Sequence, residues 1–403
     1  MKNCLIAQSG GPTSVINSSV IGVFEKNLTY KKFDNVYAGI NGIEGILNEN
    51  IVNLSEIDKD IVCNLKYTPS SGLGSCRYKL ENANSSKEEY IKLFELLSKY
   101  HIDTFFYIGG NDSMDTVNKL SIFGKEINSN IKFIGIPKTI DNDLDVMDHT
   151  PGFGSAAKFI ATTALENSLD ADVYNTKNVF IIESMGRDTG WLAASATIAR
   201  INNRPVVDFI YIPEMPFDKV KFLYDVKKKL EVKNTVTIVV SEGLRDKDGK
   251  FISQMNSFGT DKFGHAQLGG VANYLKNLLK QSGVKKVRAV ELSTLQRCSM
   301  HYASQRDIEE AYNLGEFALE NCENIESGYM VAIKRVNNIP YESEVFTLST
   351  SLVANKVKYF PKNWINSECN NVTDEAYEYT LPLIFGEPKI QYENGLPKYV
   401  KIK

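Results

Sequence analysis

The sequence has few of the residues that mark disulfide-bonded or zinc-binding domains. Its six cysteines are scattered singly along 403 residues and form no C-x-x-C pair. Cysteine pairs at short spacing are the usual sign of disulfide frameworks and zinc sites. We therefore expect reduced thiols in a cytoplasmic protein.

Long apolar runs and an excess of one charge are also missing. No stretch approaches 18 apolar residues, and the N-terminus passes directly into a short apolar strand, so we expect neither a membrane span nor a signal peptide. The net charge is −3 and the pI is near 6.0. This charge provides no basic field for nucleic acid or an anionic membrane, and we expect neither as a partner.

What the chain does have is a regular alternation of apolar strands and amphipathic helices. Its length and this alternation predict two α/β domains. Three strands in the first third, Cys4–Ala7, His101–Ile108 and Lys132–Ile136, each end in a loop rich in glycine or carboxylate. The ends of parallel strands lie along one edge of a sheet, so we expect these loops to line one phosphate-handling crevice.

Each of these loops alone has a simpler explanation. Gly10-Gly11-Pro12, with the proline expected at the first helical position, is also an ordinary turn. Asp112 and Ser113 are typical helix N-caps. Asp-Asn-Asp after a strand is a common turn sequence, and the small-residue loop 70–77 is typical of a flexible surface segment.

The second half of the chain repeats the alternation. Strands are expected at 178–183, 209–212, 235–240 and 286–291, and a glycine-rich turn at 263–270 is expected to open a helix over 271–279. The last residues, with many tyrosines, asparagines and prolines, predict short strands and loops that pack on the core.

In this order, the loops resemble the phosphofructokinase family over roughly residues 3–325. Five matches carry the resemblance: Ser9-Gly10-Gly11, Gly72-Leu-Gly74-Ser-Cys-Arg77, Gly109-Gly110-Asn111-Asp112-Ser113, Pro137-Lys138-Thr139-Ile140-Asp141-Asn142-Asp143, and Met185-Gly186-Arg187 with Gln296-Arg297. The resemblance implies two Rossmann-like three-layer α/β/α domains with the active site in the cleft between them. We expect a donor-phosphate-binding domain at 1–150 plus about 296–340, a fructose 6-phosphate-binding domain at 151–295, and a C-terminal extension at 341–403.

The resemblance also implies roles for individual residues. Asp141 corresponds to the catalytic base that takes the proton from the 1-hydroxyl of fructose 6-phosphate, and Arg77, Lys138 and Asp112 complete the catalytic set. The residues expected to bind diphosphate are Gly10, Gly11, Arg77, Gly110, Asp112, Ser113 and Lys138. Those expected to bind the sugar phosphate are Thr139, Ile140, Asp141, Asp143, Met185, Gly186, Arg187, Glu242, Arg288, Thr294, Gln296 and Arg297. Arg288 corresponds to an arginine that usually reaches in from a neighbouring subunit, so we expect a homodimer or homotetramer.

Two positions predict the phosphoryl donor. ATP-using members of the family typically have glycine where this chain has Asp112 and Lys138. A carboxylate at Asp112 would repel the α-phosphate of ATP, whereas Lys138 brings a cation to the transferred phosphate. The pair resembles the pyrophosphate-dependent branch, which transfers phosphate reversibly from pyrophosphate to fructose 6-phosphate in glycolysis and gluconeogenesis.

Two other functions remain open at this point: an ATP-dependent 6-phosphofructokinase, and a non-catalytic paralogue that binds sugar phosphates. A nucleotide-linked dehydrogenase fits less well, because no G-x-G-x-x-G is followed by a ribose-binding acid.

Several residues depart from the family pattern. The resemblance implies Mg²⁺ at Asn111 and Asp112, yet Asn111 stands where many members have an aspartate, and an amide is a weaker ligand. Asn178 stands where ATP-using bacterial relatives have an arginine for the 6-phosphate, which leaves Lys177 or another cation to compensate. Thr294 replaces a histidine or tyrosine, and the segment from His265 lacks an arginine found in a similar family segment.

Overall fold

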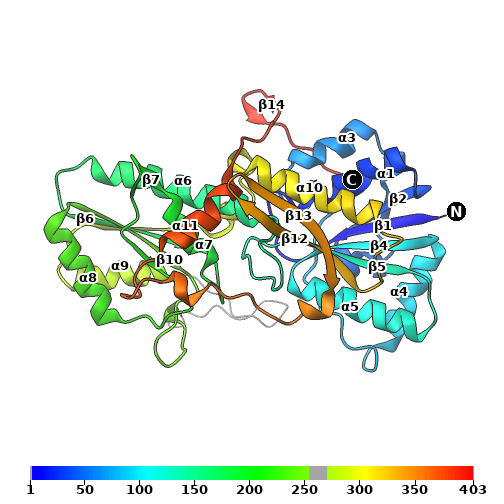
Figure 1. The fold of residues 1–403 in the computed structure, drawn as a ribbon, viewed down its shortest axis with the longest axis horizontal. Coiled ribbons are helices and arrows are strands. Elements are labelled where there is room, and N and C mark those ends of the chain that lie inside the picture. The colour runs from blue at the N-terminus through cyan, green and yellow to red at the C-terminus, as the bar shows by residue number, and fades with distance from the viewer. Residues whose placement is uncertain (1, 254–269, 403) are drawn as a thin grey trace. The chain divides into compact units, whose positions relative to one another are not determined.

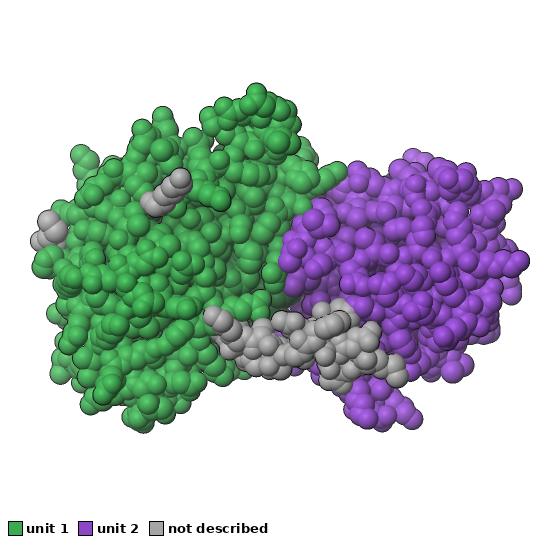
Figure 2. Space-filling view, turned by 180° about the vertical axis from the view of Figure 1, so that it is seen from behind, with its two compact units in different colours: residues 1–155, 297–357, 386–403 green, residues 156–296, 358–385 purple. Residues whose placement is uncertain are grey.

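The computed structural model describes residues 2–253 and 270–402, which form two compact units (Figures 1 and 2). Unit 1 comprises residues 1–155, 297–357 and 386–403, and unit 2 comprises residues 156–296 and 358–385. The C-terminal segment expected as one extension is thus divided between the two units. The turn expected at 263–270, with His265, lies outside the described residues except for Gly270.

Unit 1 is built on a seven-stranded sheet in the order β13-β12-β5-β4-β1-β2-β3. Five strands are parallel, and the two edge strands β3 and β13 are antiparallel to their neighbours. The bounds are β1 (Asn3–Gln8), β2 (Asn35–Gly39), β3 (Ile51–Asn53), β4 (Ile102–Gly109), β5 (Lys132–Pro137), β12 (Tyr329–Asn338) and β13 (Tyr341–Ser349). The long hairpin β12–β13 was not predicted, because its solvent-facing residues break the apolar pattern.

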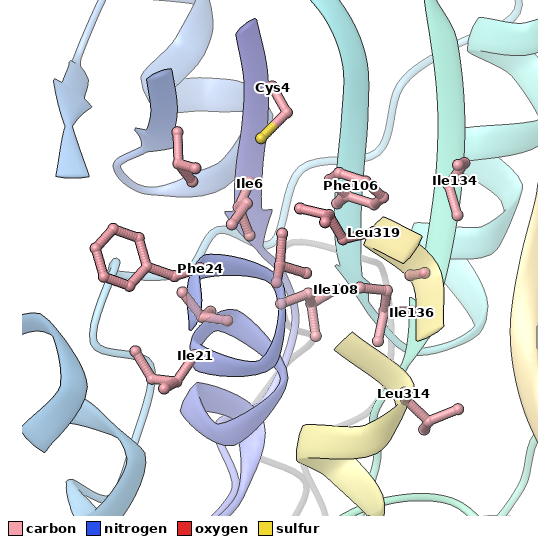
Figure 3. Packing of buried hydrophobic residues seen from close by; sticks show 14 of the residues in the cluster. Cys4, Ile6, Ile21, Phe24, Phe106, Ile108, Ile134, Ile136, Leu314 and Leu319 are labelled. Carbon is pink, nitrogen blue, oxygen red and sulfur yellow. The ribbon is translucent and has the colours of Figure 1, made fainter. Parts of the chain in front are cut away.

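Side chains of alternate residues place helices on both faces of this sheet. Cys4 and Ile6 of β1 face α1 (Ile16–Tyr30), α3 (Lys59–Asn64) and α10 (Gln305–Glu320), a packing shown in Figure 3. Leu5 and Ala7 face α2 (Gly42–Leu47), α4 (Lys87–Lys99) and α5 (Asn111–Glu126). Unit 1 is therefore the predicted three-layer α/β/α arrangement.

Two glycines allow α1 and α10 to touch backbone to backbone. A Cβ atom at Gly22 would lie 2.1 Å from the carbonyl oxygen of Tyr312, and one at Gly315 would lie 2.1 Å from that of Ser19. No side chain larger than hydrogen fits at such a distance, so this close crossing requires both glycines.

Unit 2 contains a smaller parallel sheet in the order β11-β6-β10-β9. The strand bounds are β6 (Asn178–Ser184), β9 (Phe209–Tyr211), β10 (Thr235–Ser241) and β11 (Val287–Glu291). One face packs on α8 (Lys219–Val232) and α9 (Val271–Gln281). Helix α7 (Trp191–Ala194) contacts β6, β9 and β10, and its Trp191 ring packs on Phe360 and on Tyr379 of α11 (Asp374–Thr380).

The remaining elements are short or connect these layers. They are α6 (Phe153–Asp172), β7 (Arg200–Ile201), β8 (Arg204–Pro205), β14 (Tyr392–Glu393), β15 (Leu396–Pro397), and the 3-10 helices η1 (Leu54–Glu56), η2 (Leu65–Tyr67), η3 (Ser195–Ile198), η5 (Ser293–Arg297), η6 (Met300–Tyr302), η7 (Thr350–Leu352), η8 (Lys362–Trp364) and η9 (Leu381–Ile384). Among the helices of the described chain, none combines the length and apolarity needed to cross a membrane.

One predicted helix start was wrong, and the structure excludes the alternative reading of Asp112 as a helix N-cap. Helix α1 begins at Ile16 after the N-cap Val15, so Pro12 is not its first residue. In the loop before it, the Gly10 N–H donates to Cys76 O at 3.1 Å. Helix α5 is capped by Gly110, and Asp112 therefore lies inside its first turn rather than at the cap.

Candidate active site

The strand order of unit 1 reverses beside β1. From β1 the chain moves to β2 on one side, whereas β4 and β5 lie on the other side. At such a reversal, the loops that follow neighbouring strands run in opposite directions and leave a crevice at the carboxyl ends of the strands. Ligands of α/β sheets bind in this crevice. The segments that follow β1, β4 and β5 are the three predicted loops, 9–14, 110–113 and 138–143.

Two cations lie directly on the glycine pair that follows β1. Gly10 has φ +78°, and a Cβ atom there would lie 3.0 Å from Nζ of Lys138. A Cβ atom at Gly11 would lie 3.3 Å from the Arg297 guanidinium. Any larger residue would displace these cations, so the glycines leave room for both. Arg297, predicted for the sugar phosphate, thus lies against the predicted diphosphate loop.

Lys138 is a buried cation at the start of its loop. Only 3% of the residue is exposed, and its backbone N–H donates to Gly109 O at 2.9 Å, which joins the ends of β4 and β5. Burial, together with the neighbouring charge of Arg297, lowers the pKa of Lys138 to about 8 against the attraction of Asp141. A group with this pKa needs an anion beside it to hold its proton firmly.

The turn that carries Asp141 is held from both sides. Thr139 Oγ1 accepts the Asp141 N–H at 3.1 Å, while its backbone oxygen accepts the Thr150 hydroxyl at 2.8 Å. Asn142, buried and left-handed at φ 54°, accepts the Thr150 N–H on its side-chain oxygen at 3.1 Å. Asp141 and Asp143 are half-buried. The turn therefore presents two carboxylates on a backbone that is fixed by Thr150.

The other predicted diphosphate ligands flank this loop. Ser75 Oγ donates to Gly10 O at 2.6 Å, which places the exposed Arg77 two residues from that contact. Asp112 is half-buried in the first turn of α5, where the helix dipole favours a carboxylate. Ser113 is buried, and its hydroxyl occupies the space that a side chain at Gly109 would fill. This packing limits what the Ser113 hydroxyl can offer a ligand.

Asn111 does not fit the metal-binding role predicted for it. Its amide nitrogen donates to Val353 O at 3.2 Å and to Lys356 O, and its side-chain oxygen accepts the Asn355 N–H at 2.6 Å. The described residues contain no group of three or more histidine, cysteine or acidic side chains that could hold a metal. Asp112 offers one carboxylate, which fits the way Mg²⁺ binds in many phosphate sites, through one or two carboxylates and the phosphates of the substrate.

Unit 2 brings four of its predicted residues together at the ends of β6 and β10. Met185 N–H donates to Gln296 Oε1, and Gly186 N–H donates to Glu242 Oε1, both at 3.3 Å. Glu242 N–H donates to Ser184 O at 2.9 Å, which joins the two strand ends. The carboxylate and the two turns form a polar cluster suited to hydroxyl groups. Arg187 follows directly and pairs with Asp188 at 3.0 Å.

Of three other positions in unit 2, two, Arg288 and Asn178, have partners elsewhere in the unit. Arg288 stands opposite Phe180 inside the sheet and pairs with Asp170 at 2.6 Å. Thr294 is exposed in η5. Asn178 is buried at the start of β6, where its amide nitrogen donates to Ala171 O and Thr176 O. Within this one chain, neither Arg288 nor Asn178 reaches the carboxyl ends of the strands.

The sequence reasoning did not single out a buried charge network behind the Asp141 turn. His149 lies between two carboxylates, with Nδ1 2.8 Å from Asp148 and Nε2 2.7 Å from Glu310. The adjacent acid and histidine, Asp148-His149, were the only signal in the sequence, since Glu310 is 161 residues away. Such a pairing cannot be inferred without the fold.

Residues 3–320 match the family model described as phosphofructokinase. A protein of Halomonas elongata named pyrophosphate--fructose 6-phosphate 1-phosphotransferase is 40% identical over 99% of this chain and 96% of its own length. One of the same name from Methylococcus capsulatus is 38% identical over 100% and 96%.

A solved structure is similar over the same extent. The crystal structure of pyrophosphate-dependent phosphofructokinase from Nitrosospira multiformis matches with a TM-score of 0.90 and 38% identity, covering 100% of this chain and 96% of the other. This chain belongs to the phosphofructokinase family.

Proposed function

We propose that this protein is a pyrophosphate-dependent phosphofructokinase. It transfers a phosphoryl group reversibly from pyrophosphate to the 1-hydroxyl of fructose 6-phosphate, which gives fructose 1,6-bisphosphate and phosphate. The observation that carries the proposal is the buried cation of Lys138 against Gly10, with Asp112 in the neighbouring helix turn. Relatives that match nearly the whole chain bear the corresponding name.

The donor phosphate is held by cations and backbone at the end of β1. Lys138 and Arg297 lie against the glycine pair, and Arg77 follows the loop residue Ser75, which is hydrogen-bonded to Gly10. We propose Arg297 as the third cation of this group because its guanidinium lies beside Gly11. Fixed positive charge stabilises the oxygens of a phosphoryl group in transit without reorganisation.

Asp141 is proposed as the general base. Phosphoryl transfer needs a carboxylate within hydrogen-bond reach of the attacking hydroxyl, and Asp141 stands on a turn fixed by Thr139 and Asn142. Asp143 and the unit 2 cluster of Met185, Gly186, Glu242 and Gln296 are proposed to position the sugar. Arg187, Arg288 and Thr294 remain predicted ligands of its phosphate, and a homodimer or homotetramer remains a prediction.

The divalent metal is proposed to be Mg²⁺, with Asp112 as the residue of this chain that holds it together with diphosphate. When bound, the ion would neutralise part of the charge on the diphosphate. Asn111 is not part of this proposal, since its amide is engaged by backbone groups of 353–356.

A comparison of donors tests the proposal. With fructose 6-phosphate and Mg²⁺, we expect fructose 1,6-bisphosphate to form from pyrophosphate and not at a comparable rate from ATP. A preference for ATP would identify the ATP-dependent enzyme instead. No turnover with either donor, together with retained binding of fructose 6-phosphate, would identify the non-catalytic paralogue.

The double substitution Asp112→Gly with Lys138→Gly tests whether these two residues select the phosphoryl donor. Removal of the carboxylate lifts the repulsion of a third phosphate, so we expect ATP turnover to rise relative to pyrophosphate turnover. If the ratio of the two rates does not move, these residues do not select the donor.

A further inference from the structure

We propose that His149 is a positioning residue for the Asp141 turn: clamped between Asp148 and Glu310, it anchors the segment through which Thr150 holds Thr139 and Asn142 in place. The inference rests on the proposed function, because it takes Asp141 as the catalytic base. His149 itself touches neither reacting group.

First, the charge state of His149 follows from its two hydrogen-bond partners. Both ring nitrogens face carboxylate oxygens, at 2.8 Å and 2.7 Å, so a neutral ring would point one lone pair at an anion. Burial by itself lowers the pKa of His149, but the charge of Glu310 and the hydrogen bond to Asp148 outweigh it and raise the pKa to about 9. The ring is therefore an imidazolium that donates to both acids.

The second step is the anchoring of the two acids. Asp148 accepts from Arg335 of β12 at 3.0 Å, and its N–H donates to Ile333 O at 2.9 Å. Glu310 of α10 accepts the Tyr341 hydroxyl of β13 at 2.6 Å and the Ser343 hydroxyl at 2.8 Å. His149 thus ties its segment to a helix and to two strands of unit 1.

Other charged groups complete the surroundings of the ring. Two guanidinium groups lie near the ring of Tyr341, whose hydroxyl donates to Glu310. The guanidinium carbon is 4.5 Å from the centre of that ring in Arg306 and 5.1 Å in Arg335. Asp307 of α10 is buried and accepts from Gly152 N–H and Ser155 N–H, both at 2.8 Å. The carboxylates of α10 therefore hold the segment at two points, on either side of Thr150.

The third step is the connection from this segment to the catalytic turn. Thr150 is fully buried, and its hydroxyl and N–H donate to Thr139 O and Asn142 Oδ1. Thr139 N–H in turn donates to Pro151 O at 3.2 Å. Asp141 lies between the two residues that Thr150 holds. A shift of the anchored segment would therefore move Asp141, and misplacement of a base by about 1 Å can cost ~10²-fold in rate.

The variants His149→Gln, Thr150→Val and the double substitution test this chain of contacts. We expect His149→Gln to lower kcat by about 10²-fold and Thr150→Val by about tenfold, with little change in KM for fructose 6-phosphate. If His149 acts through Thr150, the loss in the double variant is smaller than the product of the single losses. Thr350→Val is the matched control, because its buried hydroxyl also donates to a backbone carbonyl, Gly328 O at 2.7 Å.

The outcomes separate this inference from the proposed function. Folded His149→Gln with wild-type kcat, or losses that multiply in the double variant, would overturn the positioning role. If His149→Gln does not fold, Thr150→Val decides: kcat equal to that of Thr350→Val overturns the inference, and a tenfold lower value supports it. Asp141→Asn is measured alongside, and full activity there would refute the base assignment itself.

Discussion

At the scale of single residues, Lys138 shows how burial and function conflict. Its ammonium group is buried beside two guanidinium groups, which lowers its pKa to about 8. Diphosphate would relieve this conflict, because an anion beside the cation favours the charged form. The buried cation therefore costs stability in the free protein, and we expect a phosphate ligand to offset that cost.

The pKa of Lys138 predicts how activity depends on pH. The cation is lost as pH rises through about 8, so kcat/KM for pyrophosphate should fall above that pH, since this parameter reports the free enzyme. The same profile for Lys138→Met serves as the control, because it contains the ionisations of the substrate but not that of the lysine. A decline of equal size in both profiles would contradict the assignment.

The hydrogen bonds of the Asn111 side chain predict that replacing its amide by a carboxylate destabilises the protein. In Asn111→Asp, an oxygen replaces the nitrogen that donates to Val353 O and Lys356 O, so a carboxylate would face two carbonyl groups. We expect a loss of about 1–3 kcal/mol in the free energy of unfolding without added metal. Urea denaturation measures this loss.

The control for that change is Asn313→Asp in α10. It introduces the same charge at an exposed position, away from the 353–356 segment that the Asn111 amide contacts. If Asn111→Asp is as stable as Asn313→Asp, the amide does not hold the 353–356 segment. Binding of Mn²⁺ to both variants would show independently whether the new carboxylate has become a ligand.

At the scale of elements, the contact of α1 with α10 depends on glycine. A Cβ atom at Gly315 would lie 2.1 Å from a backbone oxygen of α1, which cannot rotate away as a side chain could. Gly315→Ala should therefore cost about 3 kcal/mol or more, although alanine favours an isolated helix by about 1 kcal/mol.

The midpoint of urea unfolding measures this cost, with Asn313→Ala on the exposed side of the same helix as the control. An unchanged or raised midpoint for Gly315→Ala would mean that the helices can separate without loss. Helix α10 also carries Glu310, so we expect a folded Gly315→Ala variant to lose activity as well.

At the scale of the whole molecule, two buried cations have opposite effects on how the free energy of unfolding changes with pH. The pKa of His149 is raised to about 9, so its contribution is complete below pH 6.5 and is lost as pH rises through 9. The pKa of Lys138 is lowered to about 8, so the folded state gains stability from about pH 8 to the ordinary lysine pKa near 10.4.

Unfolding of wild type and His149→Gln across pH 6–9 separates the two trends. We expect the wild type to lose stability relative to the variant over this range, by an amount on the order of 3 kcal/mol. Parallel curves would show that His149 is not protonated in the folded protein.

Much of this molecule follows from the sequence by itself. The apolar runs at 4–7, 101–108 and 132–136 determined the buried strands, because the hydrophobicity of a short run and the turn residues that follow it are local features. The donor-site residues Asp112 and Lys138 could also be proposed from the sequence, since both stand within short contiguous motifs, and their roles remain predictions. The family comparison over residues 3–320 agrees with the resemblance that these motifs carry.

The tertiary structure alone decided which distant groups complete the motifs. It placed the Arg297 guanidinium beside Gly11, the Asn111 side-chain oxygen in a hydrogen bond with the Asn355 N–H, and the Glu310 carboxylate in contact with His149 Nε2. These partners are separated by more than 100 residues, and no local pattern of hydrophobicity or turn chemistry encodes such pairs. They depend on the order of strands in the sheet and on the packing of α10, which only the folded chain establishes.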